Sequence, residues 1–267
     1  MKKFILPIII CVSSCTIAPR INVSGVPAPA NTVIDGKIYT TAYQQHAAEY
    51  RALCLQAYNI AHLRVDEIEK ENTPKPKALI TDIDETVLNN SAYEAHQVLQ
   101  GKDYESISWS EWTAKADADT IPGAYSFLKY AAAKGIEIFY VTNRNDAEKQ
   151  ATLNNLKKFN LPFADNDHIF LRTTSSSKEE RRKNIEATHS VVMLLGDNLA
   201  DFNFLFDVKN AEHRMQNVNA LANEFGERFI VLPNVTYGDW EYSLYHFNYS
   251  LTQQQKDSVL RASLISY

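Results

Sequence analysis

The sequence predicts an α/β fold with a parallel sheet flanked by helices. Four short apolar runs each end in a polar loop, and helical patterns separate the last three runs. The runs are 78–81, 136–141, 168–171 and 191–195, and the helical patterns span 146–159 and 178–187. Ligands of such sheets bind at the carboxyl ends of the strands, where all four polar loops lie. The architecture by itself therefore predicts a site at that edge.

The length and composition indicate an ordinary globular protein. A chain of 267 residues is long enough for one large domain with a small insertion. Hydrophobic residues make up 45% and charged residues 22%, which excludes disorder over most of the chain. The formal net charge of −5 leaves no basic excess for a nucleic-acid polymer, although a nucleotide monomer stays open as a substrate. The mean hydropathy of −0.31 excludes a protein with many membrane spans.

Residues 1–14 have the pattern of a signal peptide, because two lysines precede an apolar stretch too short to span a bilayer. Val12 and the small residues before Cys15 resemble the lipobox of bacterial lipoproteins. The resemblance implies cleavage before Cys15 and lipidation of that cysteine, which would hold the protein on a membrane. Thr16 is not the aspartate that usually signals inner-membrane retention, which favours the outer membrane. The alternative is a plain secretory signal with a chance cysteine.

The rest of the chain divides into a tether and one main domain. Residues 15–36 are predicted to be the tether, since glycines and prolines interrupt them and periodicity is absent. The domain spans 37–267 and opens with a helical period over 39–71. Within it, the aromatic-rich segment 88–122 is expected to form a small cap over the sheet edge. The tail 250–267 is predicted to be one amphipathic helix.

Two carboxylates, Asp82 and Asp84, follow the first predicted strand. Residues i and i+2 of an extended segment point the same way, so both can face one substrate. One carboxylate can attack phosphorus to form an aspartyl-phosphate, and the other can protonate the leaving oxygen and later activate water. Acids ahead of a helix also serve as N-caps, so the pair alone leaves that alternative open.

Asp197 and Asp201 follow the last predicted strand and bring two more acids to the same edge. Four neighbouring carboxylates repel one another unless a cation joins them, and hard oxygen ligands beside a phosphate suit Mg²⁺. The predicted cofactor is therefore Mg²⁺. Capping of a helix start by Asp197 or Asn198 is the structural alternative.

Two further residues are placed to contact a phosphate. Thr142 follows the second predicted strand and offers a hydroxyl and a loop amide. Lys178 opens a predicted helix and can offset the charge that develops on a transferring phosphoryl group. By contrast, Cys54 is expected to be a small core hydrophobe and His189 a structural residue.

These residues together resemble the four-motif set of the haloacid dehalogenase-like superfamily. Residues 80–93 resemble the first half of the class C bacterial acid phosphatase signature, and residues 192–202 resemble its second half. The two halves occur in the right order, and the resemblance covers essentially the whole chain after Cys15. It implies a parallel sheet flanked by helices, with a small mainly helical cap and an N-terminal helical extension.

The resemblance also implies a role for each acid. Asp82 is similar to the family nucleophile, and Asp84 is similar to its general acid and base. Mg²⁺ is expected on the carboxylates of Asp82 and Asp197 and on the main-chain carbonyl of Asp84. Asp201 is expected nearby, orienting metal-bound water. The phosphate contacts that it implies are Thr142 and Lys178.

The implied activity is Mg²⁺-dependent hydrolysis of small phosphomonoesters, foremost 5′-nucleotides, including those of the nicotinamide mononucleotide type. Members of this family hold the base between aromatic rings, and stacking is worth ~1–3 kcal/mol per base in nucleic-acid systems. Trp109 in the expected cap and Tyr237 are the candidates for this clamp. The alternative is that both rings only pack.

Two other functions stay open. One is a phosphotransferase of the same superfamily, which would use identical residues. The other is a surface lipoprotein that has an inactive catalytic site and only binds a ligand. The expected partners are a small phosphomonoester and a membrane reached through Cys15, with no nucleic-acid polymer. The resemblance alone suggests a homodimer.

Overall fold

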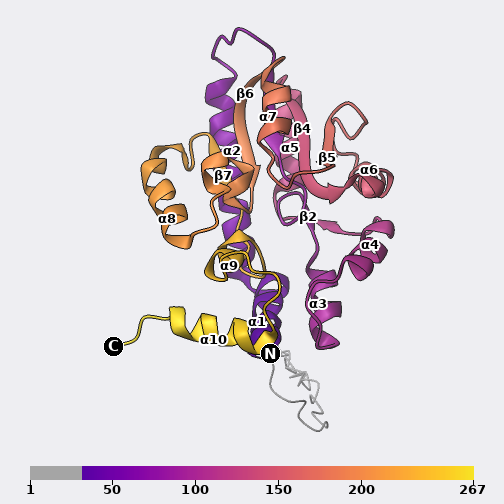
Figure 1. Ribbon diagram of the computed structural model, residues 1–267. Coiled ribbons are helices and arrows are strands. Elements are labelled where there is room, and N and C mark those ends of the chain that lie inside the picture. The colour runs from indigo at the N-terminus through magenta and orange to yellow at the C-terminus, as the bar shows by residue number, and fades with distance from the viewer. Residues whose placement is uncertain (1–31) are drawn as a thin grey trace, which may run out of the picture. The chain divides into compact units, whose positions relative to one another are not determined.

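The computed structural model describes residues 32–267, which are built around a five-stranded sheet (Figure 1). The strands are β1 (Lys77–Thr81), β4 (Glu137–Asn145), β5 (Ile169–Arg172), β6 (Ser190–Gly196) and β7 (Phe229–Val231). Their order is β5-β4-β1-β6-β7, and every neighbouring pair is parallel. The predicted α/β class is therefore confirmed. The sequence pattern misses β7, because three residues are too few to show a period.

Helices cover both faces of the sheet, so its strands are buried on both sides. Leu79 of β1 belongs to a core that α2 (Ala48–Ile68), α5 (Ala124–Ala133) and α6 (Lys149–Lys158) complete. Its neighbours Ala78 and Ile80 belong to a second core, which includes Ile185 of α7 (Glu179–Glu186). Successive residues of a strand point to opposite faces, which explains why the strands are continuous apolar runs. Cys54 lies in the first core, as expected.

Two helices, α1 (Thr32–His46) and α2, stand where one helix over 39–71 is expected. The extended backbone of Ala47 separates them. Helix α1 begins inside the predicted tether, 15–36, so that prediction is too long at its carboxyl end. The reason is the burial of Val33 and Ile34, which outweighs the ~1 kcal/mol that a glycine such as Gly36 costs within a helix.

The predicted signal peptide, Cys15 and the tether up to residue 31 lie outside the described residues. Within residues 32–267, no helix is both long enough and apolar enough to cross a membrane.

The segment 88–122 contains two helices, α3 (Ser91–Leu99) and α4 (Ser106–Ala114), as expected for a mainly helical cap. Its two ends are joined by an antiparallel pair of short strands, β2 (Leu88–Asn89) and β3 (Asp119–Thr120). Figure 1 shows α3 and α4 on the side of β2 away from the main sheet. The pairing of β2 with β3 ties the cap to the loop that follows β1.

The remaining elements are short helices around the sheet. They are η1 (Asp146–Glu148), η2 (Leu199–Asp201), η3 (Phe204–Phe206), α8 (Ala211–Ala220), η4 (Ala222–Glu224), α9 (Asp239–Leu244) and α10 (Gln253–Ser263). The predicted tail helix over 250–267 is thus present but shorter. The hydroxyl of Thr252 accepts a hydrogen bond from the amide of Gln255, which fixes its start. It ends at Ser263, and Ile265 and Tyr267 beyond it are fully exposed.

Candidate active site

Three adjacent strands bring the predicted acids together. β1 pairs with β4 on one side and β6 on the other, so the loops that follow them meet at one edge. The amide of Asp82 donates to the carbonyl of Leu195 at 2.9 Å, which extends the β1–β6 pairing to the first acid. Carboxylate oxygens of Asp82, Asp197 and Asp201 all lie within 4.8 Å of one another. The convergence that the sequence predicts is therefore present.

Lys178 inserts its ammonium between two of these acids. It donates to Oδ1 of Asp82 and lies 2.6 Å from Oδ1 of Asp201. Its side chain is 5% exposed. Burial alone would lower the pKa of a lysine, but Asp201 and Asp82 outweigh burial and raise the pKa of Lys178. The lysine is held charged at the centre of the cluster.

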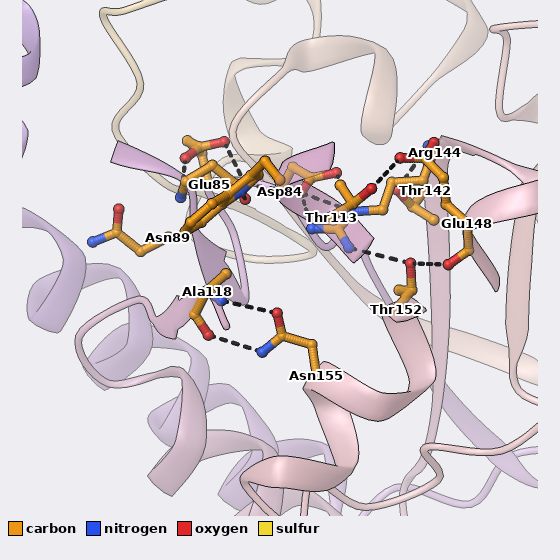
Figure 2. Close-up of polar contacts among 12 residues, drawn as sticks. Asp84, Glu85, Asn89, Thr113, Ala118, Thr142, Arg144, Glu148, Thr152 and Asn155 are labelled. Atoms are coloured by element: carbon orange, nitrogen blue, oxygen red, sulfur yellow. Dashed lines mark hydrogen bonds and ion pairs between the residues drawn. The ribbon is translucent and has the colours of Figure 1, made fainter. Parts of the chain in front are cut away.

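Asp84 makes a different set of contacts (Figure 2). Nε of Arg144 lies 3.1 Å from both carboxylate oxygens of Asp84, and Nη2 lies 2.8 Å from Oδ1. Asn90 Nδ2 donates to the same Oδ1 at 2.8 Å. This forked ion pair fixes the plane of the carboxylate. The two acids of the Asp82–Asp84 pair therefore have separate cationic partners, Lys178 and Arg144.

Arg144 is itself locked in place. Its side chain is 1% exposed, and Nη1 donates to Oγ1 of Thr152 at 3.2 Å. The amide of Arg144 donates to Oγ1 of Thr142 at 3.2 Å. Figure 2 shows Arg144 reaching from β4 between Asp84 and Thr152. Thr142 is fully buried and is not part of the cavity wall, whereas its neighbour Asn143 is.

Asp197 and Asp201 are oriented by the loops around them. Thr86 Oγ1 donates to Asp197 at 3.3 Å, and Asn234 Nδ2 donates to its other oxygen at 2.8 Å. The amide of Asn198 donates to Oδ2 of Asp201 at 3.0 Å, which makes Asp201 part of a capping box. The capping alternative is thus partly realised by Asn198 and Asp201, while both acids still face the cavity.

Burial and mutual repulsion make two of the acids hard to ionise. Burial raises the pKa of Asp82 to about 7, with Lys178 opposing the rise and Asp201 and Asp84 adding to it. Burial, Asp82 and Asp201 hold the pKa of Asp197 well above its usual range. A cation bound here would relieve this repulsion, and the donors are all hard oxygen atoms. The residues present therefore fit a hard divalent metal ion such as Mg²⁺.

Glu85 is a buried carboxylate beside the site. It lies in the segment 80–93 that carries the family resemblance, but the sequence gives it no role of its own. Its backbone is left-handed, with φ of 56°, a conformation that costs energy for a residue other than glycine. Its carboxylate accepts from the amide of Asn90 at 2.8 Å and from the hydroxyl of Tyr237. Burial and the nearby Asp84 raise the pKa of Glu85 to about 8. These contacts hold the turn after Asp84 in its strained shape.

A cavity of about 340 Å³ opens over the acids. Its wall includes all four predicted acids, Lys178, and both predicted clamp residues, Trp109 and Tyr237. Arg144 lies over the indole of Trp109 with Cζ 5.7 Å from the ring centre, and Tyr93 packs edge-on against the same ring. The hydroxyl of Tyr237 is engaged with Glu85. Both rings are thus anchored by protein contacts while they border the cavity.

Comparison with known proteins bears directly on this arrangement. Residues 11–240 match the family described as the HAD superfamily, subfamily IIIB (acid phosphatase). The class C acid phosphatase of Bacillus anthracis superposes with a TM-score of 0.85 at 38% identity, covering 88% of this chain and 99% of that one. Its tungstate-bound structure matches with a TM-score of 0.86 at 37% identity, covering 89% and 100%. The chain belongs to this acid phosphatase family.

A more distant relative is acid phosphatase 1 of Solanum lycopersicum. It is 25% identical over 130 residues, which are 46% of this chain and 50% of the tomato protein. The chain therefore spans about half the length of that curated relative. The resemblance to the class C acid phosphatases and the phosphomonoesterase class are confirmed at the level of the family.

The candidate site also contains residues to which the sequence analysis gave no role. They are Asn90, Arg144 and Glu148, with Glu85 and Asn234. Each makes its contacts with other protein groups in the site. Glu85 and Asn90 lie in the segment 80–93 that carries the family resemblance. Arg144 follows a buried strand in the same polar loop as Thr142, which is a signal that could have been used.

Proposed function

We propose that the protein is a Mg²⁺-dependent phosphatase that hydrolyses small phosphomonoesters, foremost 5′-nucleotides, through an aspartyl-phosphate (an acyl phosphate) formed on Asp82. The observation that carries the proposal is the pairing of Asp82 with Lys178 and of Asp84 with Arg144 at the end of one strand. Two carboxylates with separate partners can take two separate roles. The tungstate-bound state of the Bacillus anthracis relative supports an oxyanion-binding site in this family.

In the proposed reaction, an oxygen of Asp82 attacks phosphorus, and the bond from phosphorus to the leaving oxygen breaks. Asp84 in its protonated form gives its proton to that oxygen, so the alcohol leaves neutral. Asp84 then takes a proton from water, which attacks the phosphoryl group and regenerates Asp82. Lys178 offsets negative charge on the phosphoryl oxygens throughout. Such catalysis depends mostly on positioning and electrostatics.

Asp82 and Asp197 would hold the metal ion with the main-chain carbonyl of Asp84, and Asp201 would lie close by. When bound, the ion supplies positive charge that lets an anionic nucleophile approach an anionic phosphoryl group. The raised pKa values of Asp82 and Asp197 support this assignment. They show that the buried carboxylates repel one another, and a bound cation would relieve that repulsion.

The first test is phosphate release from a panel of 5′-nucleotides, with and without a strong chelator. We expect release that stops with chelator and returns with Mg²⁺. Asp82→Asn should abolish turnover while the fold is retained, and Asp84→Asn should lower kcat by ~10²–10⁴-fold, the usual contribution of general acid–base catalysis. Near-normal activity of Asp82→Asn, or indifference to the chelator, would contradict the mechanism.

The clamp needs its own test. Tyr237→Ala should raise KM for a nucleotide far more than KM for a small aryl phosphate, because stacking is worth ~1–3 kcal/mol per base. Tyr237→Phe is the matched control, since it keeps the ring and removes only the hydroxyl bound to Glu85. Equal effects of Tyr237→Ala on both substrates would dismiss the clamp, and Trp109→Ala can be judged in the same way.

The alternatives are separated by simple assays. A phosphotransferase would deliver phosphate to an added alcohol in preference to water. A binding lipoprotein with an inactive site would bind nucleotides without releasing phosphate. The intact set of acids and Lys178 around the cavity favours the hydrolase.

We further propose that the protein is anchored to the bacterial outer membrane through a lipid on Cys15. Support comes from the sequence before and around Cys15. Incorporation of labelled palmitate into the wild type, and its loss in Cys15→Ser, would test the anchor. Sedimentation of the chain starting after Cys15 would test the homodimer that the family resemblance suggests.

A further inference from the structure

A buried arginine, Arg214 of α8, has no role in the proposed reaction. Its side chain is 7% exposed, and it does not belong to the wall of the cavity over the acids. Helix α8 packs against η3 and α9. Arginine is almost never buried unless it is paired, so its partners indicate what a buried arginine does.

The guanidinium of Arg214 joins three separate segments. Nη1 donates to the carbonyl of Phe206 in η3 and lies 3.6 Å from Oδ2 of Asp239, the first residue of α9. Nη2 donates to Oδ1 of Asn198 at 3.3 Å. The contacts with Phe206 and Asp239 hold the guanidinium in place. The contact with Asn198 connects it to the loop that carries two of the acids.

Asn198 lies between these two acids. It directly follows Asp197, and its amide donates to Oδ2 of Asp201 at 3.0 Å. Its side-chain oxygen accepts from the amide of Ala200 at 3.4 Å as well as from Arg214. Hydrogen bonds from a charged donor are the stronger kind. By fixing this side chain, Arg214 also fixes the backbone that positions both acids.

A second buried arginine, Arg182 of α7, holds the same turn. Its Nη1 donates to the carbonyl of Ala200 at 2.8 Å and to that of Asp201 at 2.9 Å. Across residues 32–267, neither arginine makes a hydrogen bond to the carboxylate of Asp197 or Asp201. The two guanidinium groups therefore hold the turn without occupying the oxygen atoms that a metal ion would use.

We infer that Arg214 is a positioning residue of the proposed metal site, which acts through the side chain of Asn198 to raise the affinity for the divalent ion. This inference rests on the proposed function, because it concerns the ion that is proposed to assist phosphoryl transfer. Partners that orient metal ligands are typically worth ~10–100-fold in metal affinity or activity. Without the contact to Asn198, the turn is held less firmly and Asp197 is less well placed for the ion.

The charge of Arg214 would have the opposite effect on metal binding. A guanidinium repels a nearby divalent cation. Burial lowers the pKa of Arg214, and carboxylates that include Asp239 and Asp201 oppose the lowering, so its charge acts on the acid cluster. If Arg214 acted only through its charge, its removal would tighten metal binding. If it positions Asn198, its removal weakens metal binding.

The test is Arg214→Met, which keeps an unbranched apolar side chain and removes the charge and the donors. Binding of Mn²⁺ to the metal-free protein is measured by electron paramagnetic resonance with Mg²⁺ as competitor, so no turnover is needed. Mn²⁺ takes the same hard oxygen ligands as Mg²⁺. We expect both ions to bind about tenfold more weakly to the variant.

Two further variants examine the contact itself. Asn198→Ala should also weaken metal binding, and adding Arg214→Met to it should have little further effect, because both changes remove the same contact. Arg214→Lys is the milder change, since it keeps the buried charge but loses the fork that reaches Asn198 and Asp239 together. It too should weaken metal binding.

Ile136→Val controls for a general loss of stability. Ile136 is 1% exposed and directly precedes β4, at the end of the sheet opposite the site. The change should cost ~0.5–1.5 kcal/mol of stability and leave the metal affinity of the wild type. In Arg214→Met, phosphate release should fall most at low Mg²⁺ and recover as Mg²⁺ is raised. A general structural defect would lower release at every Mg²⁺ concentration.

Each result decides a different point. Unchanged or tighter metal binding in Arg214→Met or Arg214→Lys would overturn the inference, as would a large further loss when Arg214→Met is added to Asn198→Ala. A wild type that binds Mn²⁺ but releases no phosphate would overturn the proposed function alone, since the metal affinities of the variants can still be compared. A wild type that binds neither ion would overturn the proposed metal site and this inference with it.

Discussion

Gly196, the last residue of β6, has no room for a side chain. A Cβ there would lie 2.3 Å from Oδ2 of Asp201 and 2.5 Å from its Cβ. These distances are far inside van der Waals contact, so any side chain at Gly196 must displace Asp201. Asp201 in turn holds the amide of Asn198 and the ammonium of Lys178. Because glycine has only a hydrogen atom at this position, Asp201 can stay in contact with Asn198 and Lys178.

Gly196→Ala should lower phosphatase activity strongly and destabilise the protein by ~1–3 kcal/mol, the usual cost of overpacking. Gly36→Ala is the matched control, because Gly36 lies in α1 and a Cβ added there would meet no atom within 4 Å. That change should stabilise the protein by up to ~1 kcal/mol. Urea unfolding and phosphate release measure both effects. Full activity of Gly196→Ala would show that Asp201 can move without loss.

Some residues of the candidate site could be predicted from the sequence, and others could not. Asp82, Asp84, Asp197 and Lys178 could be predicted, because each directly follows a strand or opens a helix, and strand ends in a parallel sheet converge. Arg144 could not be given a role, because its function comes from reaching Asp84, sixty positions earlier in the chain. Such partnerships depend on tertiary structure that no local pattern encodes.

At the level of elements, the end of the sheet opposite the site is held by a histidine pair. Glu137, the first residue of β4, accepts from His168 Nε2 at 2.7 Å and contacts His189 Nε2 at 3.0 Å. His168 also lies 2.6 Å from Asp165. Glu137 thereby connects the segments that enter β5 and β6. His189 has the structural role that the sequence predicts.

These contacts predict a pH-dependent contribution to stability. Burial lowers the pKa of His168, but Asp165 and Glu137 outweigh it and raise the pKa above its ordinary value. The folded state therefore binds the proton more tightly than the unfolded chain does. The stabilisation is fully present below the unfolded pKa, about 6.5, and is lost as the pH rises through the folded pKa.

His168→Gln should thus reduce the free energy of unfolding most at pH 5–6 and least above pH 8. The control is His213→Gln, because His213 is exposed and makes no side-chain hydrogen bond among residues 32–267. Chemical unfolding across this pH range measures both variants. A wild-type advantage over His168→Gln that grows with pH would contradict the assignment.

Elements also show where sequence patterns fail. The strands β1, β4, β5 and β6 and the helices α6 and α7 were predictable from the sequence. A strand buried on both faces is a continuous apolar run, and a helix buried on one face has apolar residues at the helical period. The early start of α1 and the break at Ala47 follow from packing against distant segments, and the pairing of β2 with β3 involves two residues on each side. Contacts between elements decide those features.

On the scale of the whole molecule, the site draws on both ends of the described chain. Gln44 of α1 donates to Glu85 at 3.4 Å and to Asn89 at 3.3 Å. Thr236 donates to the amide oxygen of Gln44 at 3.4 Å. The turn that carries Asp84 is therefore supported by a helix far ahead of it in the sequence and by a loop far behind it.

Removing α1 should therefore impair catalysis as well as stability. A chain shortened to begin at Ala48 should have a lower Tm and a strongly reduced kcat, whereas one that begins at Thr32 should keep the activity of the chain starting after Cys15. Phosphate release and thermal unfolding on the two shortened chains measure this. Equal kcat values for both would show that Gln44 is dispensable for the site.

The burial of Cys54 determines how the protein responds to reducing and oxidising surroundings. Cys54 is the free thiol of residues 32–267, it is fully buried, and burial raises its pKa to about 11. A thiol that is neither ionised nor accessible reacts slowly with oxidants and alkylating agents. Residues 32–267 therefore have no disulfide to lose and no reactive thiol to protect. The same domain should hold its shape in the reducing interior of a cell and in the oxidising space outside it.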